Sequence, residues 1–178
     1  GTKWATSAPQ LVTASGGAAF STILQEGFNS AGVPAGWSTT IAPAGAAPGA
    51  FTLRPNNYST AGYTFRSNDM TQFYLANSNA TGAAYNTTIV TPAINLTGYT
   101  SATLSFYHFY LPFSGDSVEV QWSATGAPGN AGWNVLWSHK ITQLGTNTNF
   151  VLRNVDISAR AGFATTYFRW RFVGDDDF

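Results

Sequence analysis

Short runs in which hydrophobic and polar residues alternate recur along the chain, and they are separated by Gly, Pro, Asn and Ser residues. Alternation with a period of two residues is the pattern of a β-strand that buries one face. Helical spacing of hydrophobic residues is hard to find in any part of the sequence. The pattern predicts eight strands, at 20–28, 72–76, 87–94, 102–111, 117–123, 134–139, 149–156 and 166–173. That number of short strands in one domain is typical of a sandwich of two antiparallel sheets.

The faces of two predicted strands can be assigned from the pattern. In SVEVQWS (117–123), valine and tryptophan alternate with polar residues, so one face is predicted to lie in the core and the other in water. In ATLSFYHFYL (102–111), large hydrophobic residues occupy both faces, which predicts a central strand. The Ala/Gly/Pro-rich segment 33–51 is predicted to be a surface loop anchored by Trp37. Residues 1–19 are small and polar, and we expect a linker or N-terminal arm before a single domain at 20–178.

Composition narrows the classes of partner. Lys and Arg number 8, as do Asp and Glu, and charged residues are only 9% of the 178-residue chain. A partner made of nucleic acid needs a basic surface, which such a sequence cannot supply. No apolar stretch approaches the roughly 20 residues of a membrane span, so we expect no direct membrane insertion. With 15% aromatic residues and no cysteine, an all-β extracellular domain without disulfides is expected. The opening residues Gly1–Trp4 resemble an internal stretch of a longer sequence, so we expect the chain to be a segment of a larger polypeptide.

Five short motifs occur in a particular order along residues 20–178. They are EGFN (26–29), PAGW (34–37), TPAINL (91–96), LSFYH (104–108) and WNVL (133–136). In this order they resemble the choice-of-anchor J or cleaved adhesin domains and, more distantly, the MAM domain. The resemblance implies an all-β fold, a jelly-roll β-sandwich of two antiparallel sheets. Family members end with one more strand, which this sequence lacks, so the edge left open is expected to reflect a truncation or to accept a strand donated from elsewhere.

The resemblance also implies a structural calcium ion near the junction of the first and last strands, held by oxygen ligands. Carried over by motif position, the candidate ligands are Glu26, Asn29 and Asp69. The loop aspartates Asp175, Asp176 and Asp177 could add further oxygen atoms. The alternative is that these three residues are solvated side chains beside a turn glycine.

Carbohydrate binding is the functional option that the aromatic content favours, because sugars stack on exposed rings and bond to amide or carboxylate groups. The candidate ligand-binding residues, in or near predicted loops, are Tyr58, Tyr63, Tyr85, Trp133 and Trp137. The alternative for each is a place in the core. No catalytic constellation is recognised, and His108 is expected to be a hydrogen-bonded core residue. Ser117, in Asp-Ser-Val, resembles the O-glycosylation pattern of bacteria that secrete such domains.

The resemblance therefore implies a non-catalytic adhesion or ligand-binding module of a large secreted bacterial cell-surface protein. Its expected partners are an extracellular polysaccharide or a surface protein and other domains of the same polypeptide, and export would often use the type IX route. One alternative is an accessory domain of a secreted peptidase or other hydrolase. Another is a structural spacer or filament subunit that is completed by a donated strand.

Overall fold

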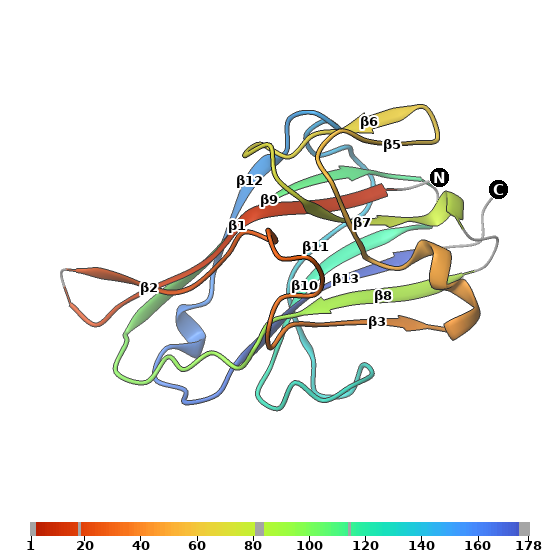
Figure 1. The fold of residues 1–178 in the computed structure, drawn as a ribbon. Helices are drawn as coiled ribbons and strands as arrows, with labels where there is room; N and C mark the ends of the chain where they lie inside the picture. The colour runs from red at the N-terminus through yellow and green to blue at the C-terminus, as the bar shows by residue number, and fades with distance from the viewer. Residues whose placement is uncertain (1–2, 18, 81–83, 114, 175–178) are drawn as a thin grey trace.

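A computed structural model gives the structure of the chain and describes residues 3–17, 19–80, 84–113 and 115–174. Two antiparallel sheets pack face to face as a sandwich (Figure 1). Sheet A has the strand order β12-β9-β1-β7-β4, and β2 pairs with β1 outside this path. Its strands are β1 (Lys3–Ser15), β2 (Phe20–Glu26), β4 (Thr52–Arg54), β7 (Phe73–Asn77), β9 (Ser101–Leu111) and β12 (Val151–Asp156).

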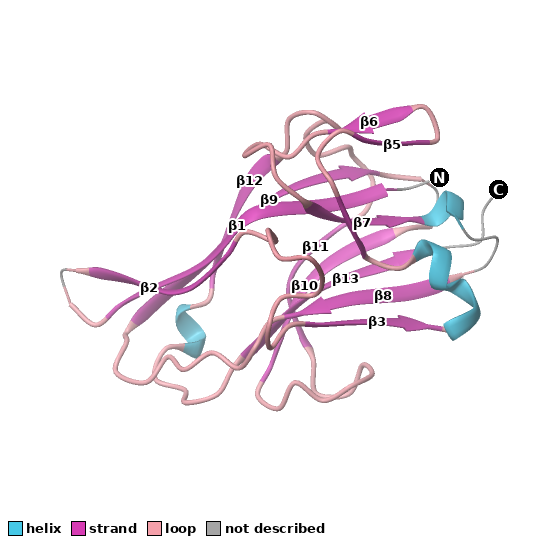
Figure 2. Ribbon diagram, viewed as in Figure 1, coloured by secondary structure: helices cyan, strands magenta, loops and turns pink. Residues whose placement is uncertain are grey.

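Sheet B has the order β11-β10-β13-β8-β3. Its strands are β3 (Ser38–Ala42), β8 (Tyr85–Val90), β10 (Ser117–Ser123), β11 (Asn134–His139) and β13 (Tyr167–Gly174). A separate hairpin is formed by β5 (Tyr58–Thr60) and β6 (Tyr63–Phe65). The few helical segments are the short 3-10 turns η1 (Ala44–Gly49), η2 (Ser78–Ala80) and η3 (Ser158–Arg160) (Figure 2). Across the part of the chain that the structure describes, no helix is long and apolar enough to cross a membrane.

The predicted jelly-roll sandwich is confirmed as an all-β sandwich, and each of the eight predicted strands has a counterpart. The strand predicted at 102–111 is central, as expected, because β9 pairs with β12 on one side and with β1 on the other. Trp37 is the anchor that we expected for segment 33–51. It is buried and packs 5.3 Å from Phe28 and 6.0 Å from Trp170, measured between ring centres. The same segment nevertheless contains a strand, β3, that the prediction of a loop missed.

The N-terminal segment differs most from its prediction. The expected linker or arm at 1–19 is wrong for residues 3–15, which form β1 in the middle of sheet A. Trp4 and Val12 of β1 lie fully buried between the sheets, and Ala5 is buried on the opposite face. Since sheet A is covered on both faces here, small side chains fit on both sides of β1 and no amphipathic alternation appears in the sequence.

This position also bears on the missing strand, which we expected either to be lost by truncation or to be donated from elsewhere. Residues 3–7 of β1 pair with β7, residues 10–15 pair with β2, and the other edge of β1 pairs with β9. The N-terminal segment therefore supplies a central strand from within the same chain. The predicted loop Asp175–Asp177 lies outside the described residues.

Two hydrophobic clusters cover both faces of sheet A and the inner face of sheet B, so that only the outer face of sheet B is polar. The main core lies between the sheets and includes Trp4, Phe106, Val120 and Trp170. A second cluster joins the outer face of sheet A to the β5–β6 hairpin, which contributes Phe65. Figure 1 shows this hairpin over sheet A. The outer face of sheet B instead carries polar side chains, and these form the candidate site.

Candidate ligand-binding site

The outer face of sheet B is polar because successive residues of β10 and β13 point to opposite sides of the sheet. Val120 of β10 pairs with Trp170 of β13, and both side chains are buried in the core. The next pair, Gln121 with Arg169, therefore faces outward. Glu119 pairs with Arg171 in the same outward register. Four groups that can form several hydrogen bonds each thus gather on two neighbouring strands.

A loop between β10 and β11 forms one wall over this face. Ser123 Oγ accepts hydrogen bonds from the backbone N–H groups of Thr125 and Gly126, both at 3.2 Å, which fixes the start of the loop. The loop passes so close to β13 that a Cβ on Gly126 would lie 2.8 Å from the Tyr167 ring. At the end of the loop, the indole N–H of Trp133 donates to the carbonyl of Ala127 at 2.9 Å. Trp133 is therefore held in place by its own loop.

Between this loop and the outer strands lie two adjoining hollows, which we call the sheet B groove. They have cavity volumes of about 180 and 230 Å³. The residues that line one or both hollows are Ser38, Thr40, Ile41, Ala42, Asn86, Thr88, Val90, Gly126, Ala127, Pro128, Gly129, Asn130, Trp133 and Arg169. On the side opposite the loop, the hydroxyls of Thr40 and Thr88 lie 2.6 Å apart. The groove thus combines one aromatic ring, hydroxyls, amides and a cation.

Arg169 lies at the centre of these contacts and is only 3% exposed. Its Nε donates to Gln121 Oε1 at 2.5 Å, and its Nη1 donates to the carbonyl of Gly129 at 2.6 Å. Its Nη2 donates to Asn130 Oδ1 at 3.1 Å, and its guanidinium carbon lies 4.3 Å from the centre of the Trp133 ring. Burial and, to a smaller extent, the charge of Arg171 lower the pKa of this guanidinium to about 10, although Glu119 acts in the opposite direction.

Arg171 completes the polar network. Its Nη1 lies 2.8 Å from Glu119 Oε2 in a partly buried ion pair, and its Nη2 donates to Asn86 Oδ1. The same Glu119 oxygen accepts a hydrogen bond from Gln121 Nε2 at 2.8 Å. Because each group is held by its neighbours, the floor beside the groove is preorganised. Neither arginine was a predicted site residue. The signal was present, since two of only eight basic residues alternate with aromatic residues in FRWRF (168–172).

The structure brings only one of the five predicted aromatic residues to the groove. Trp133 lines it, whereas Tyr58 and Tyr63 lie on the β5–β6 hairpin over sheet A. Tyr85 was expected near the surface but is only 2% exposed and packs against Phe172, with ring centres 5.5 Å apart. Its ring cannot offer a face to a ligand, because β13 covers it.

Trp137, on β11, lies among charged and aromatic side chains rather than at the groove. Its ring centre lies 4.9 Å from the Arg153 guanidinium carbon and 5.3 Å from the centre of the His108 ring. His108 is fully buried, as we expected, and its Nδ1 accepts a hydrogen bond from Trp4 Nε1 at 3.3 Å. Burial first, and then the charges of Arg153 and His139, lower the pKa of His108 to about 3. His108 therefore has a structural role as a neutral core residue.

The predicted calcium ligands are engaged in local turns. Glu26 Oε1 accepts a hydrogen bond from the backbone N–H of Phe28 at 2.6 Å, and Asp69 Oδ1 accepts one from Thr71 at 3.1 Å. Among the described residues, no group of three or more His, Cys, Asp or Glu side chains could hold a metal ion. Asp175, Asp176 and Asp177 lie outside the described residues, so calcium stays a prediction.

The predicted glycosylation residue is poorly accessible. Ser117 begins β10 and is only 6% exposed. Attachment of a sugar to its hydroxyl in the folded domain would require this end of the strand to open.

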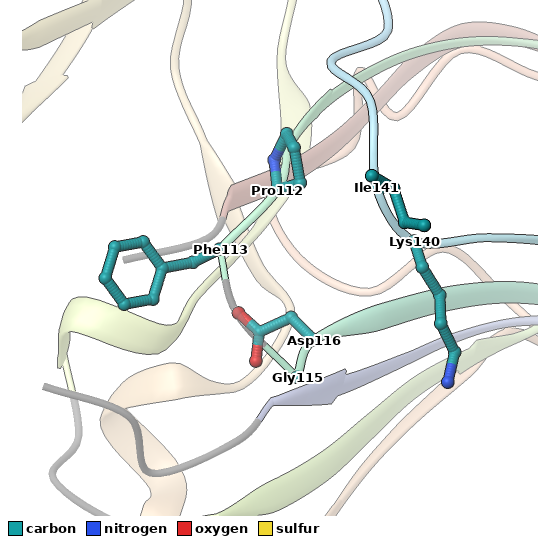
Figure 3. A pocket seen from close by; sticks show the side chains of 6 residues that line it. All are labelled: Pro112, Phe113, Gly115, Asp116, Lys140 and Ile141. Atoms are coloured by element: carbon teal, nitrogen blue, oxygen red, sulfur yellow. The ribbon is translucent and has the colours of Figure 1, made fainter.

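A larger hollow, of about 470 Å³, lies at one end of the sandwich, near the start of β10 (Figure 3). It is lined by Pro112, Phe113, Gly115, Asp116, Lys140 and Ile141. Figure 3 shows the Asp116 carboxylate turned toward Phe113 and away from Lys140. Among the described residues that line this hollow, the two charged side chains point apart, whereas polar groups converge in the sheet B groove, and we therefore take the groove as the candidate site.

The fold of the chain is similar to that of known proteins with solved structures. No protein-family model matches the chain, and no curated protein sequence matches it significantly. The K1 cleaved adhesin domain of Lys-gingipain from Porphyromonas gingivalis W83 is similar in structure, with a TM-score of 0.57 and 18% identity over 84% of this chain and 93% of that domain. The K3 cleaved adhesin domain of the same protein has a TM-score of 0.58 and 18% identity, over 83% and 87% of the two chains. The chain therefore has a cleaved-adhesin-like fold, as its motifs predicted.

Proposed function

We propose that the chain is a non-catalytic, adhesion-type module of a larger secreted cell-surface protein, and that it binds carbohydrate in the sheet B groove. The observation that carries the proposal is the Trp133 ring, which is fixed at the edge of a hollow lined by hydroxyl and amide groups. The fold shared with two domains named cleaved adhesins supports the adhesion-type role. Other domains of the same polypeptide are the expected neighbours.

The chemistry of the groove suits a sugar better than an apolar ligand. A sugar presents apolar ring faces bordered by hydroxyl groups, so it needs an aromatic surface together with groups that donate and accept hydrogen bonds. Trp133 offers the first, and Thr40, Thr88 and Asn86 offer the second. Because the Trp133 ring is already held by Ala127 and Arg169, little side-chain entropy is lost on binding.

The experiment is affinity electrophoresis of the chain in native gels that contain a soluble polysaccharide. A bound polysaccharide retards the protein, and Trp133→Ala should abolish the retardation. Tyr63→Ala is the matched control, because it removes an exposed ring on the hairpin over the other sheet. Equal loss of retardation in both variants, or retardation that survives Trp133→Ala, would contradict the assignment of the site.

A second candidate function, a structural unit that assembles through strand pairing, is favoured by β2. Among the described residues this strand pairs only with β1, so its other edge is open. Its first six residues, FSTILQ, contain no charge, Pro or Gly, and Phe20 is 74% exposed. Natural edge strands usually carry charged residues or Pro, which hinder pairing, because an open edge pairs readily with another strand. These six residues of β2 lack that protection.

Sedimentation equilibrium tests this second candidate. If two copies pair through β2, the wild-type chain self-associates and Thr22→Lys weakens the association, since a charge on the edge disfavours pairing. Thr148→Lys adds the same charge to an exposed loop beside the Tyr110 end of β9, far from the Ser101 end where β1 and β2 pair, and should leave the association unchanged. A wild-type chain that stays monomeric at high concentration would rule the assembly function out.

A further inference from the structure

Among the described residues, no carboxylate pairs with the buried charge of Arg169. Its three hydrogen bonds go to the neutral oxygens of Gln121, Gly129 and Asn130. Within the described ranges, the one salt bridge joins Arg171 to Glu119, so the nearest carboxylate on this face already has a partner. Buried charges in proteins are usually paired, because an uncompensated charge is costly to remove from water.

The charges around the groove also leave one positive charge without compensation. Two arginines and one glutamate stand on the outer face of β10 and β13, which leaves one positive charge in excess. Apart from Arg169, the residues that line the groove are uncharged. A guanidinium has five N–H donors in a planar fork, and three of those of Arg169 are used. An oxyanion in the groove would therefore offset the charge and find donors in place.

The groove has an excess of only one positive charge, and this limits the class of ligand that it can bind. One net charge suits a single oxyanion per site, whereas a nucleic acid backbone would require a row of cations. Trp133, Thr40 and Thr88 provide the ring face and hydroxyls that suit a sugar, so the anion is expected to be attached to one. A carboxylate and a sulfate ester both accept paired hydrogen bonds from a guanidinium.

We propose that the sheet B groove binds an acidic sugar unit of a glycan, whose carboxylate or sulfate group is the counter-ion of Arg169. This inference rests on the proposed carbohydrate-binding function and specifies its ligand class. Arg169 recognises the oxyanion, and Trp133 covers both the guanidinium and part of the groove.

The decisive variant is Asn130→Asp. Asn130 Oδ1 already accepts a hydrogen bond from Arg169 Nη2, so aspartate supplies an internal counter-ion with almost no change of shape. Asn154→Asp is the matched control, because it adds the same charge to the exposed residue Asn154 on β12 of sheet A. Arg169→Gln removes the charge directly, but it also removes the hydrogen bonds that hold Gly129 and Asn130 of the loop, a weakness that Asn130→Asp does not share.

The probes are polygalacturonate, dextran sulfate and unmodified dextran in affinity electrophoresis, and free glucuronate and inorganic sulfate in thermal-shift assays. Wild type and Asn154→Asp should bind an acidic polymer at least about tenfold more tightly than dextran, and Asn130→Asp should lose that preference. Preference for polygalacturonate identifies a carboxylate as the anion, and preference for dextran sulfate identifies a sulfate.

The failures of the two proposals are distinguishable. If wild type and Asn130→Asp bind dextran and the acidic polymers equally, the acidic-sugar inference is overturned and the carbohydrate function stands. If no polymer binds but glucuronate or sulfate stabilises wild type and not Asn130→Asp, the anion site is supported without the carbohydrate function. If neither polymers nor small anions have any effect, both proposals are overturned.

Discussion

The guanidinium of Arg169 lies against the ring of Trp133, with 4.3 Å between the guanidinium carbon and the ring centre. This contact joins β13 to the loop that walls the sheet B groove, and the Arg169 hydrogen bond to Gly129 adds a second link. The aromatic residue proposed to bind ligand thus also covers a buried cation. Stability and recognition are consequently coupled at this position.

Trp133→Ala should lower the free energy of unfolding by about 1–2 kcal/mol, because it removes a cation–π contact and exposes the guanidinium to water. Trp133→Phe should cost less, since it keeps a ring but loses the hydrogen bond to Ala127. Urea denaturation followed by circular dichroism measures both changes. Unchanged stability in Trp133→Ala would show that the ring does not secure the loop on β13.

Gly126→Ala should destabilise the same loop by a different route. Gly126 has a φ of +63°, and an added Cβ would lie 2.8 Å from the Tyr167 ring, so the change brings both backbone strain and a steric clash. Gly62→Ala is the matched control, since its φ is +81° but nothing lies within 4 Å of the added atom.

We expect Gly62→Ala to cost about 1 kcal/mol and Gly126→Ala to cost about 1–2 kcal/mol more. Chemical denaturation gives the two values, and affinity electrophoresis should show weaker polysaccharide binding for Gly126→Ala alone. Equal costs would mean that the Tyr167 ring moves aside freely and does not fix the loop.

The sequence predicted the sandwich because its strands have regular alternation, as in β10, where Val118 and Val120 face the core. It failed for β1, because Ala5, Thr6 and Ser7 are small or polar and yet fully buried. Their burial comes from the pairing of β1 with β9 and β7 and from coverage of both faces of sheet A, which are tertiary effects. Alternation within a single segment cannot reveal them.

The candidate site was predictable only in part. Trp133 was identified because a tryptophan in a predicted loop is a plausible sugar-binding residue. Arg169 and Arg171 were missed, because their role arises from register, which places them opposite Gln121 and Glu119 on a neighbouring strand. Tyr85 was misassigned for the same kind of reason, since its burial depends on its contact with Phe172 of β13.

Acid should destabilise the domain through His108. Burial holds its folded-state pKa at about 3, below the value of about 6.5 expected in the unfolded chain. Between these values the unfolded chain binds a proton that the folded chain does not, so stability falls as the pH falls from about 6.5 toward 3. The maximal slope from this one group is about 1.4 kcal/mol per pH unit.

Urea titrations at several pH values between 7 and 4 measure this dependence. His108→Gln should flatten it, because glutamine does not titrate and its carbonyl can still accept the Trp4 hydrogen bond. His139→Gln keeps the buried imidazole and should retain most of the slope. A slope that is identical in wild type and His108→Gln would show that carboxylates, rather than His108, cause the acid sensitivity.

Removal of residues 1–15 should unfold the domain, although these residues look like an arm in the sequence. β1 bridges β9 and β7, and without it sheet A separates into two parts and the core loses Trp4, Val12 and Ala14. We therefore expect a chain of residues 16–178 to lack cooperative thermal unfolding by calorimetry.

A synthetic peptide of residues 3–15 should restore the transition, because its strand edges and side chains match the gap. The same peptide with Val12→Asp should fail, since it would place an unpaired charge in the core. If residues 16–178 fold cooperatively alone, β1 is an addition to a self-sufficient sandwich, and its central position does not determine stability.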